Sequence, residues 1–124
     1  MAIKSFLDLE VYQLAHKFAM KIFEVTKTFP YEERFSLTDQ VRRSTRSIAV
    51  NTAEGWGKRE YVGNFKRHLV DGMGSLEESK SWLLFAKDCN YITIDIYNQL
   101  LTEAEVLGSK LRRLHDKWKD FGTS

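Results

Sequence analysis

The chain is 124 residues long and carries 19 lysines and arginines against 17 aspartates and glutamates, a formal net charge of +2. This is the length of one domain, residues 1–124, and the hydrophobic content of 43% excludes a disordered chain. No apolar run approaches the length of a membrane span, and no signal-peptide stretch follows the N-terminus. The single cysteine, Cys89, excludes an intrachain disulfide. We therefore expect a cytoplasmic protein that makes no membrane contact.

The first predicted helix spans roughly residues 8–27. Its apolar residues recur every three or four positions, as one face of a helix requires: Val11, Ala15, Phe18, Ile22 and Val25. We expect the Asp8 carboxylate to cap its N-terminus, and Pro30 to end it, because the residue before a proline avoids helical geometry.

The second predicted helix spans roughly residues 36–55 and ends at the glycines 55 and 57. Ser36 lies three residues before Asp39, which predicts a weak capping box. The inward face is narrow and rich in small or polar groups: Leu37, Val41, Ser44, Ile48 and Asn51.

The third predicted helix spans roughly residues 60–87, with Phe65, Leu69, Gly72, Leu76, Leu83 and Ala86 at helical spacing. Gly72 and Gly74 lie inside it, and each costs about 1 kcal/mol of helix propensity relative to alanine. This cost predicts that another backbone passes close by. The alternative is a local break in the helix.

The fourth predicted helix spans roughly residues 93–120, with Thr93 or Asp95 as its cap. Its apolar seam steps by three and four residues: Tyr97, Ala104, Leu107, Leu111, Leu114, Trp118 and Phe121. Four helices joined by short loops predict an all-α fold, an antiparallel up-down four-helix bundle.

The balanced net charge conceals an uneven distribution along the chain. Residues 1–39 carry −1, residues 40–70 carry +5 and residues 71–124 carry −2. The bases of the middle segment are the candidate nucleic-acid ligands: Arg42, Arg43, Arg46, Lys58, Arg59, Lys66 and Arg67. Guanidinium groups suit phosphate, because their planar donors engage two oxygens at once.

Two further interpretations of the basic segment remain open. The arginines are equally well explained as protein–interface or intrahelical groups. Trp56 and Tyr61, which are interleaved with the bases, are candidates for stacking on unpaired nucleotides. For Trp56 we prefer the interpretation that it covers one end of the bundle.

Polar residues gather on or near the inward side of the second helix, among them Gln40, Asn51 and Glu54 together with Ser44 and Ser47. A buried asparagine needs hydrogen-bond partners for its amide. We expect a structural polar network, within the bundle or between subunits, in which Glu54 pairs with an arginine. The alternative is that these groups cap helix ends and face solvent.

A longer pattern points to a family. Residues 36–55 read S-L-T-D-Q-V-R-R-S-T-R-S-I-A-V-N-T-A-E-G, and residues 74–78 read G-S-L-E-E. The chain opens with F-L-D-L at residues 6–9, followed by Val11 and Tyr12. These blocks resemble the small four-helix-bundle proteins encoded in intervening sequences of bacterial 23S ribosomal RNA genes, once labelled a ribosomal protein family.

The resemblance implies a bundle fold and a homopentamer. It also implies similarity to accessory proteins of diversity-generating retroelements, which bind nucleic acid beside a reverse transcriptase. The family offers no active site to carry over.

The residues themselves offer little sign of an enzyme. No histidine follows a glutamate at the spacing of di-iron bundles, and no zinc or phosphate-loop motif is complete. We therefore expect no catalytic residues, metal or cofactor. The leading hypothesis is a non-enzymatic homo-oligomer that binds RNA or DNA through the basic segment, and the alternative is a protein–protein scaffold that makes no nucleic-acid contact.

Overall fold

The four predicted helices are all present, and their ends differ from the expected ones by a few residues. The computed structural model describes residues 3–122, with side chains described as far as residue 118. The predicted seam residue Phe121 thus lies outside the described side chains. The helices are α1 (Glu10–Thr26), α2 (Leu37–Gly57), α3 (Val62–Asp88) and α4 (Ile94–Gly122), with short 3-10 helices η1 (Phe6–Asp8) and η2 (Tyr31–Glu33).

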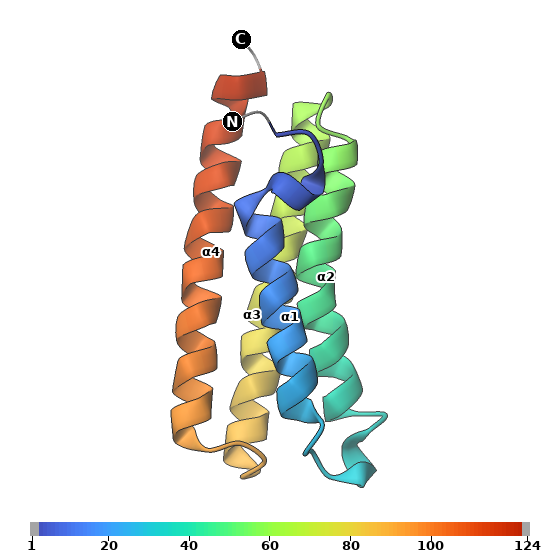
Figure 1. Cartoon of the computed structure of the whole chain (residues 1–124), viewed down its shortest axis with the longest axis vertical. Helices are drawn as coiled ribbons and strands as arrows, with labels where there is room; N and C mark the ends of the chain where they lie inside the picture. The colour runs from blue at the N-terminus through green and yellow to red at the C-terminus, as the bar shows by residue number, and fades with distance from the viewer. Residues whose placement is uncertain (1–2, 123–124) are drawn as a thin grey trace.

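The helices form the antiparallel up-down bundle that the sequence predicts, and residues 3–122 contain no strand. Each helix packs against the next in the chain, and α4 returns to α1, so that α1 and α3 lie on one diagonal (Figure 1). The contact between α1 and α4 is the least extensive of the four. None of the described helices is both long and apolar enough to cross a membrane.

The core is a heptad-like seam, as in left-handed helical bundles. The buried positions of α3 alternate steps of four and three: Phe65, Leu69, Gly72, Leu76, Ser79, Leu83 and Ala86. Leu100, Ala104, Leu107 and Leu111 of α4 follow the same rhythm and are fully buried. The periodicity of the sequence thus identifies the buried face of α3 and the central part of the α4 seam correctly.

Two of the predicted helix caps are wrong. Asp8 does not cap α1; its carboxylate accepts from the amides of Lys4 (2.8 Å) and Ser5 (3.2 Å) and so closes η1. Ser36 precedes α2 but makes no capping bond with its side chain. Its hydroxyl donates instead to Glu33, whose carboxylate accepts the amide of Leu37 at 3.3 Å. Thr93 does cap α4, because its hydroxyl accepts the amide of Ile96 at 3.1 Å.

The two glycines inside α3 have different roles. A Cβ on Gly72 would lie 3.7 Å from the carbonyl oxygen of Ile48 on α2, so the predicted close approach of another backbone is confirmed there. Gly74 has nothing within 4 Å of that position, and the same prediction is wrong for it. The helix continues unbroken through both residues.

Candidate nucleic-acid interface

The predicted basic segment separates into two groups in space. Arg42, Arg43 and Arg46 lie in the first half of α2, whereas Lys58 and Arg59 follow its last residue, Gly57. A helix rises 1.5 Å per residue, so Arg46 and Lys58 are about 18 Å apart along the axis. The segment therefore supplies two surfaces rather than one.

Arg42 is engaged within the chain. Its Nε donates to Thr26 Oγ1 at 2.8 Å, and its Nη2 donates to the carbonyl oxygen of Phe23 at 3.4 Å. The guanidinium carbon also lies 4.7 Å from the centre of the Phe23 ring. These contacts supply a partner for one of the carbonyls that a helix leaves free at its C-terminus. Arg42 thus joins α2 to the end of α1.

Arg43 and Arg46 both lie on the exposed side of α2. The Arg46 guanidinium is 5.9 Å from the centre of the Phe23 ring. Neither arginine forms an ion pair within residues 3–118. Both are therefore accessible to a ligand.

The second basic group gathers where α2 ends and α3 begins. Lys58 and Arg59 lie in the connection 58–61, and Lys66 and Arg67 lie in the first two turns of α3. Arg59 donates to the carbonyl oxygen of Trp56 at 2.9 Å, and its guanidinium lies 4.1 Å from the ring centre.

The aromatic residues at this end divide into one buried and one exposed. Trp56 is only 8% exposed and packs against Trp118 of α4, with ring centres 6.3 Å apart. This confirms that Trp56 covers the bundle end. Tyr61 is 65% exposed and is the aromatic residue at this end with a face open to a ligand.

The fold adds a base that sequence reasoning missed. Phe65 of α3 packs against Trp118, with ring centres 4.3 Å apart, so the last turns of α4 reach the end where α3 begins. The pKa of Asp116 is lowered, first by a hydrogen bond with His115 and further by the positive charges of Arg112 and Lys66. Arg112 and Lys66 therefore lie near the same carboxylate. We call the cluster of Lys58, Arg59, Lys66, Arg67 and Arg112 the basic end.

A signal for this addition was present in the sequence. Residues 110–119 carry five bases and one acid, but the acids of residues 71–109 cancel them in a sum over the whole segment. The net charge of residues 110–119 alone shows this concentration of bases.

The predicted polar network exists along the seam between α2 and α3. Asn51 Nδ2 donates to the carbonyl oxygen and the hydroxyl of Ser47, at 3.0 and 3.1 Å. The Ser47 and Ser75 hydroxyls lie 2.9 Å apart, and Ser79 Oγ donates to Ser44 Oγ at 2.8 Å. Small hydrogen-bonded side chains thus take the place of large apolar ones along this part of the α2–α3 contact.

The network reaches the basic end through His68. Its Nε2 lies 3.1 Å from Lys58 Nζ, and its Nδ1 lies 3.1 Å from Asn51 Oδ1. An ammonium group only donates, so Nε2 accepts from Lys58 and the proton of the neutral ring sits on Nδ1, where it is donated to Asn51. The geometry therefore specifies one tautomer and aligns Lys58, His68 and Asn51 in one directed chain.

The other two predicted network residues lie outside it. Glu54 is exposed at the rim, with its carboxylate 3.9 Å from Lys58 Nζ and 4.0 Å from His68 Nε2, and it pairs with no arginine of the described part of the chain. Gln40 is also exposed and lines a surface hollow beside Phe35 and Trp82. Of the three, only Asn51 joins the two helices.

One comparison decides the family. A model of the 23S rRNA-intervening sequence protein family matches residues 7–113, which is most of the chain. The chain belongs to this family. The matched range of this 23S rRNA-intervening sequence protein contains the whole α2–α3 polar seam and every member of the basic end. No curated protein matches the chain.

The charge of the basic end suits it to binding anions. Its members are lysines and arginines, which bear fixed positive charges at neutral pH. Across the part of the chain that the structure describes, no three histidine, cysteine, aspartate or glutamate side chains cluster as metal ligands would.

Proposed function

We propose that this 23S rRNA-intervening sequence protein is a non-enzymatic cytoplasmic homo-oligomer, most simply a pentamer, that binds structured RNA or DNA through its basic end. The observation that carries the proposal is that Lys58, Arg59, Lys66 and Arg67 gather where α2 ends and α3 begins, in the same segment as the exposed ring of Tyr61. Arg112 of α4 adds a charge near the carboxylate that Lys66 also approaches. Phosphate contacts supply affinity, and an exposed aromatic face supplies stacking.

Exposed apolar residues support the oligomer. Ile94, Ile96 and Val106 on α4 lie outside the core, although a monomer needs only one apolar face on this helix. A ring of identical chains would cover such residues and repeat the basic end around its axis, which multiplies the attraction for a polyanion.

The alternative is a scaffold that contacts only proteins. It is favoured by the hydrogen bond from Arg42 to Thr26 of α1, because an arginine used within the fold is not available to bind phosphate. Under this alternative, substitutions on the surface would change the oligomer or its partner, and nucleic-acid affinity would be absent at all salt concentrations.

The test is the salt dependence of binding to a fluorescently labelled RNA hairpin. Phosphate contact predicts that Arg67→Ala and Arg112→Ala each weaken binding and each reduce the slope of log affinity against log salt by about 1. Arg34→Ala, on the exposed connection before α2, is the control and should leave the slope unchanged. RNA binding that ignores Arg67 and Arg112 would place the site elsewhere.

A further inference from the structure

A hollow of about 250 Å³ lies on the seam between α1 and α4. The ion pair between Lys110 Nζ and Glu10 Oε1, at 3.1 Å, sets the first residue of α1 level with residue 110 of α4. Because α1 begins there and α4 continues to Gly122, about 18 Å of α4 extends beyond α1. The hollow lies where α4 extends past the start of α1.

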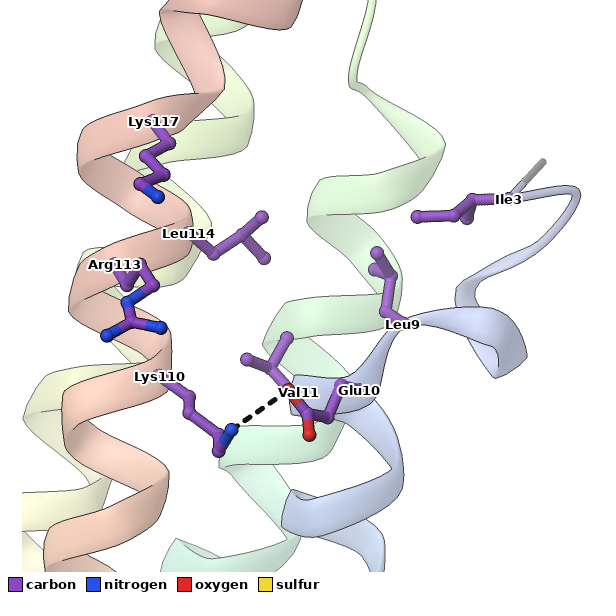
Figure 2. A pocket seen from close by; sticks show the side chains of 8 residues that line it. All are labelled: Ile3, Leu9, Glu10, Val11, Lys110, Arg113, Leu114 and Lys117. Atoms are coloured by element: carbon purple, nitrogen blue, oxygen red, sulfur yellow. Dashed lines mark hydrogen bonds and ion pairs between the residues drawn. The ribbon is translucent and has the colours of Figure 1, made fainter. Parts of the chain in front are cut away.

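The walls of the hollow are aliphatic. Leu114 of α4 points across it toward Leu9 and Ile3, and Val11 lies beneath them (Figure 2). Leu9 and Val11 are buried members of the core, whereas Ile3 is 47% exposed. An apolar side chain bound in the hollow would thus contact residues of the existing hydrophobic core.

One edge of the hollow is basic. Lys110, Arg113 and Lys117 follow one another along α4 over about 10 Å (Figure 2). Lys110 is paired with Glu10, but Arg113 and Lys117 are exposed and form no ion pair with any residue of the described range. Arg113 and Lys117 attract negative charge, and the aliphatic lining of the hollow favours apolar groups. A ligand that is both apolar and acidic would satisfy both.

From this combination we propose that the hollow binds a peptide segment of a partner protein that carries one or two apolar side chains flanked by carboxylates. The volume is below the roughly 300–1,000 Å³ of typical small-molecule sites, and it suits side chains better than a whole ligand. The aliphatic walls offer nucleotides no aromatic surface for stacking. The basic end is separate, because Arg112 faces α3 whereas Arg113 faces the hollow. The site is independent of the nucleic-acid proposal.

The experiment uses the full chain and three fluorescein-labelled hexapeptides at low ionic strength. The probe is Glu-Asp-Leu-Glu-Phe-Glu; the controls are Glu-Asp-Ser-Glu-Ser-Glu, which lacks the apolar side chains, and Lys-Lys-Leu-Lys-Phe-Lys, which lacks the acids. Fluorescence anisotropy should show binding of the probe and at least about tenfold weaker binding of both controls.

Two matched pairs of variants locate the site. Arg113→Glu should weaken binding of the probe by about five- to tenfold, whereas Arg112→Glu, the same change on the neighbouring residue, should not. Ile3→Ser should weaken it as well, whereas Leu7→Ser, at an exposed leucine outside the hollow, should not. All four positions are exposed or half-exposed, and circular dichroism checks that each variant folds.

Three results would overturn the proposal. The first is probe binding no tighter than that of both control peptides. The second is tight binding that is insensitive to Arg113→Glu and Ile3→Ser. The third is displacement of the bound probe by an equimolar RNA hairpin, which would make the hollow part of a nucleic-acid surface.

Discussion

At the scale of single residues, Arg42 shows how the same side chain serves either the fold or the surface. Sequence alone left both roles open, because Arg42 and Arg46 are one turn apart and look equivalent. They differ in their contacts with α1. Arg42 donates to the Thr26 hydroxyl oxygen and to the Phe23 carbonyl near the end of that helix, whereas the Arg46 guanidinium lies 5.9 Å from the centre of the Phe23 ring. No local pattern in α2 contains that information.

This difference predicts that Arg42→Ala lowers the free energy of unfolding by about 1–3 kcal/mol, because it removes two charge-assisted hydrogen bonds. Arg43→Ala is the matched control on the exposed side of the helix and should change it by less than about 0.5 kcal/mol. Urea unfolding measures both. Equal losses in the two variants would mean that the Arg42 contacts contribute nothing to stability.

A second residue-scale contact ties the connection before α2 to the connection between α3 and α4. The Tyr91 hydroxyl donates to Glu33 Oε2 at 2.8 Å. Hydrogen bonds from Ser36 and Tyr91 lower the pKa of Glu33 from its ordinary 4.5, and the bond to Glu33 raises the pKa of Tyr91 to about 12. The carboxylate and the neutral phenol are therefore the forms that the fold favours.

The two shifts define a pH window. The depressed pKa of Glu33 gives stability that is present above pH 4.5 and lost as pH falls through the folded pKa. The raised pKa of Tyr91 gives stability that is present below pH 10 and lost as pH rises toward about 12.

Tyr91→Phe should therefore lower the urea midpoint at neutral pH, and its difference from the unmodified protein should shrink at both extremes. Tyr31→Phe, at a tyrosine that is exposed in η2, is the control and should match the unmodified protein throughout. A Tyr91→Phe deficit that stays constant from acid to alkaline pH would contradict the role of this hydrogen bond.

At the scale of elements, the helices and their buried faces could be predicted because both follow from local periodicity. The caps could not, because each depends on how a connection folds back. The Glu33 carboxylate reaches the amide of Leu37, the first residue of α2, only because η2 turns the chain toward it. The Asp8 carboxylate does not cap α1, because it accepts backbone amides at the start of η1. The α2–α3 seam was half predictable: Asn51 stood out as an inward polar residue, but its partners on α3 did not.

The seam makes a prediction about two glycines with equal helix propensity. A Cβ on Gly55 would lie 3.0 Å from His68 Cβ and 3.1 Å from the buried Phe65 ring, and neither can move away easily. Gly55→Ala should therefore destabilise the protein by about 1–3 kcal/mol. Gly74→Ala meets nothing within 4 Å and should stabilise it by about 0.5–1 kcal/mol.

Thermal unfolding of the two variants tests this pair. The alanines bring the same gain in helix propensity, so opposite signs isolate the packing of α2 against α3. Stabilisation by both would show that the seam has room at Gly55.

At the scale of the whole molecule, the sequence indicated the family and a concentration of bases but not their arrangement. A long helix separates Arg43 and Arg46 from Lys58 and Arg59. Antiparallel packing brings Arg112, distant in sequence, near the Asp116 carboxylate that Lys66 also approaches. The net charge of +2 reveals neither this separation of the bases nor the approach of Arg112. Charge becomes informative only after the helices are placed.

The most direct test of the account is multi-angle light scattering on the purified full chain, with and without bacterial RNA at low salt. We predict a mass several times the 14.5 kDa of one chain, five times for a pentamer, and a heavier complex with RNA that dissociates as salt is raised. A 14.5 kDa monomer whose mass does not change when RNA is added would contradict both the oligomer and the nucleic-acid interface.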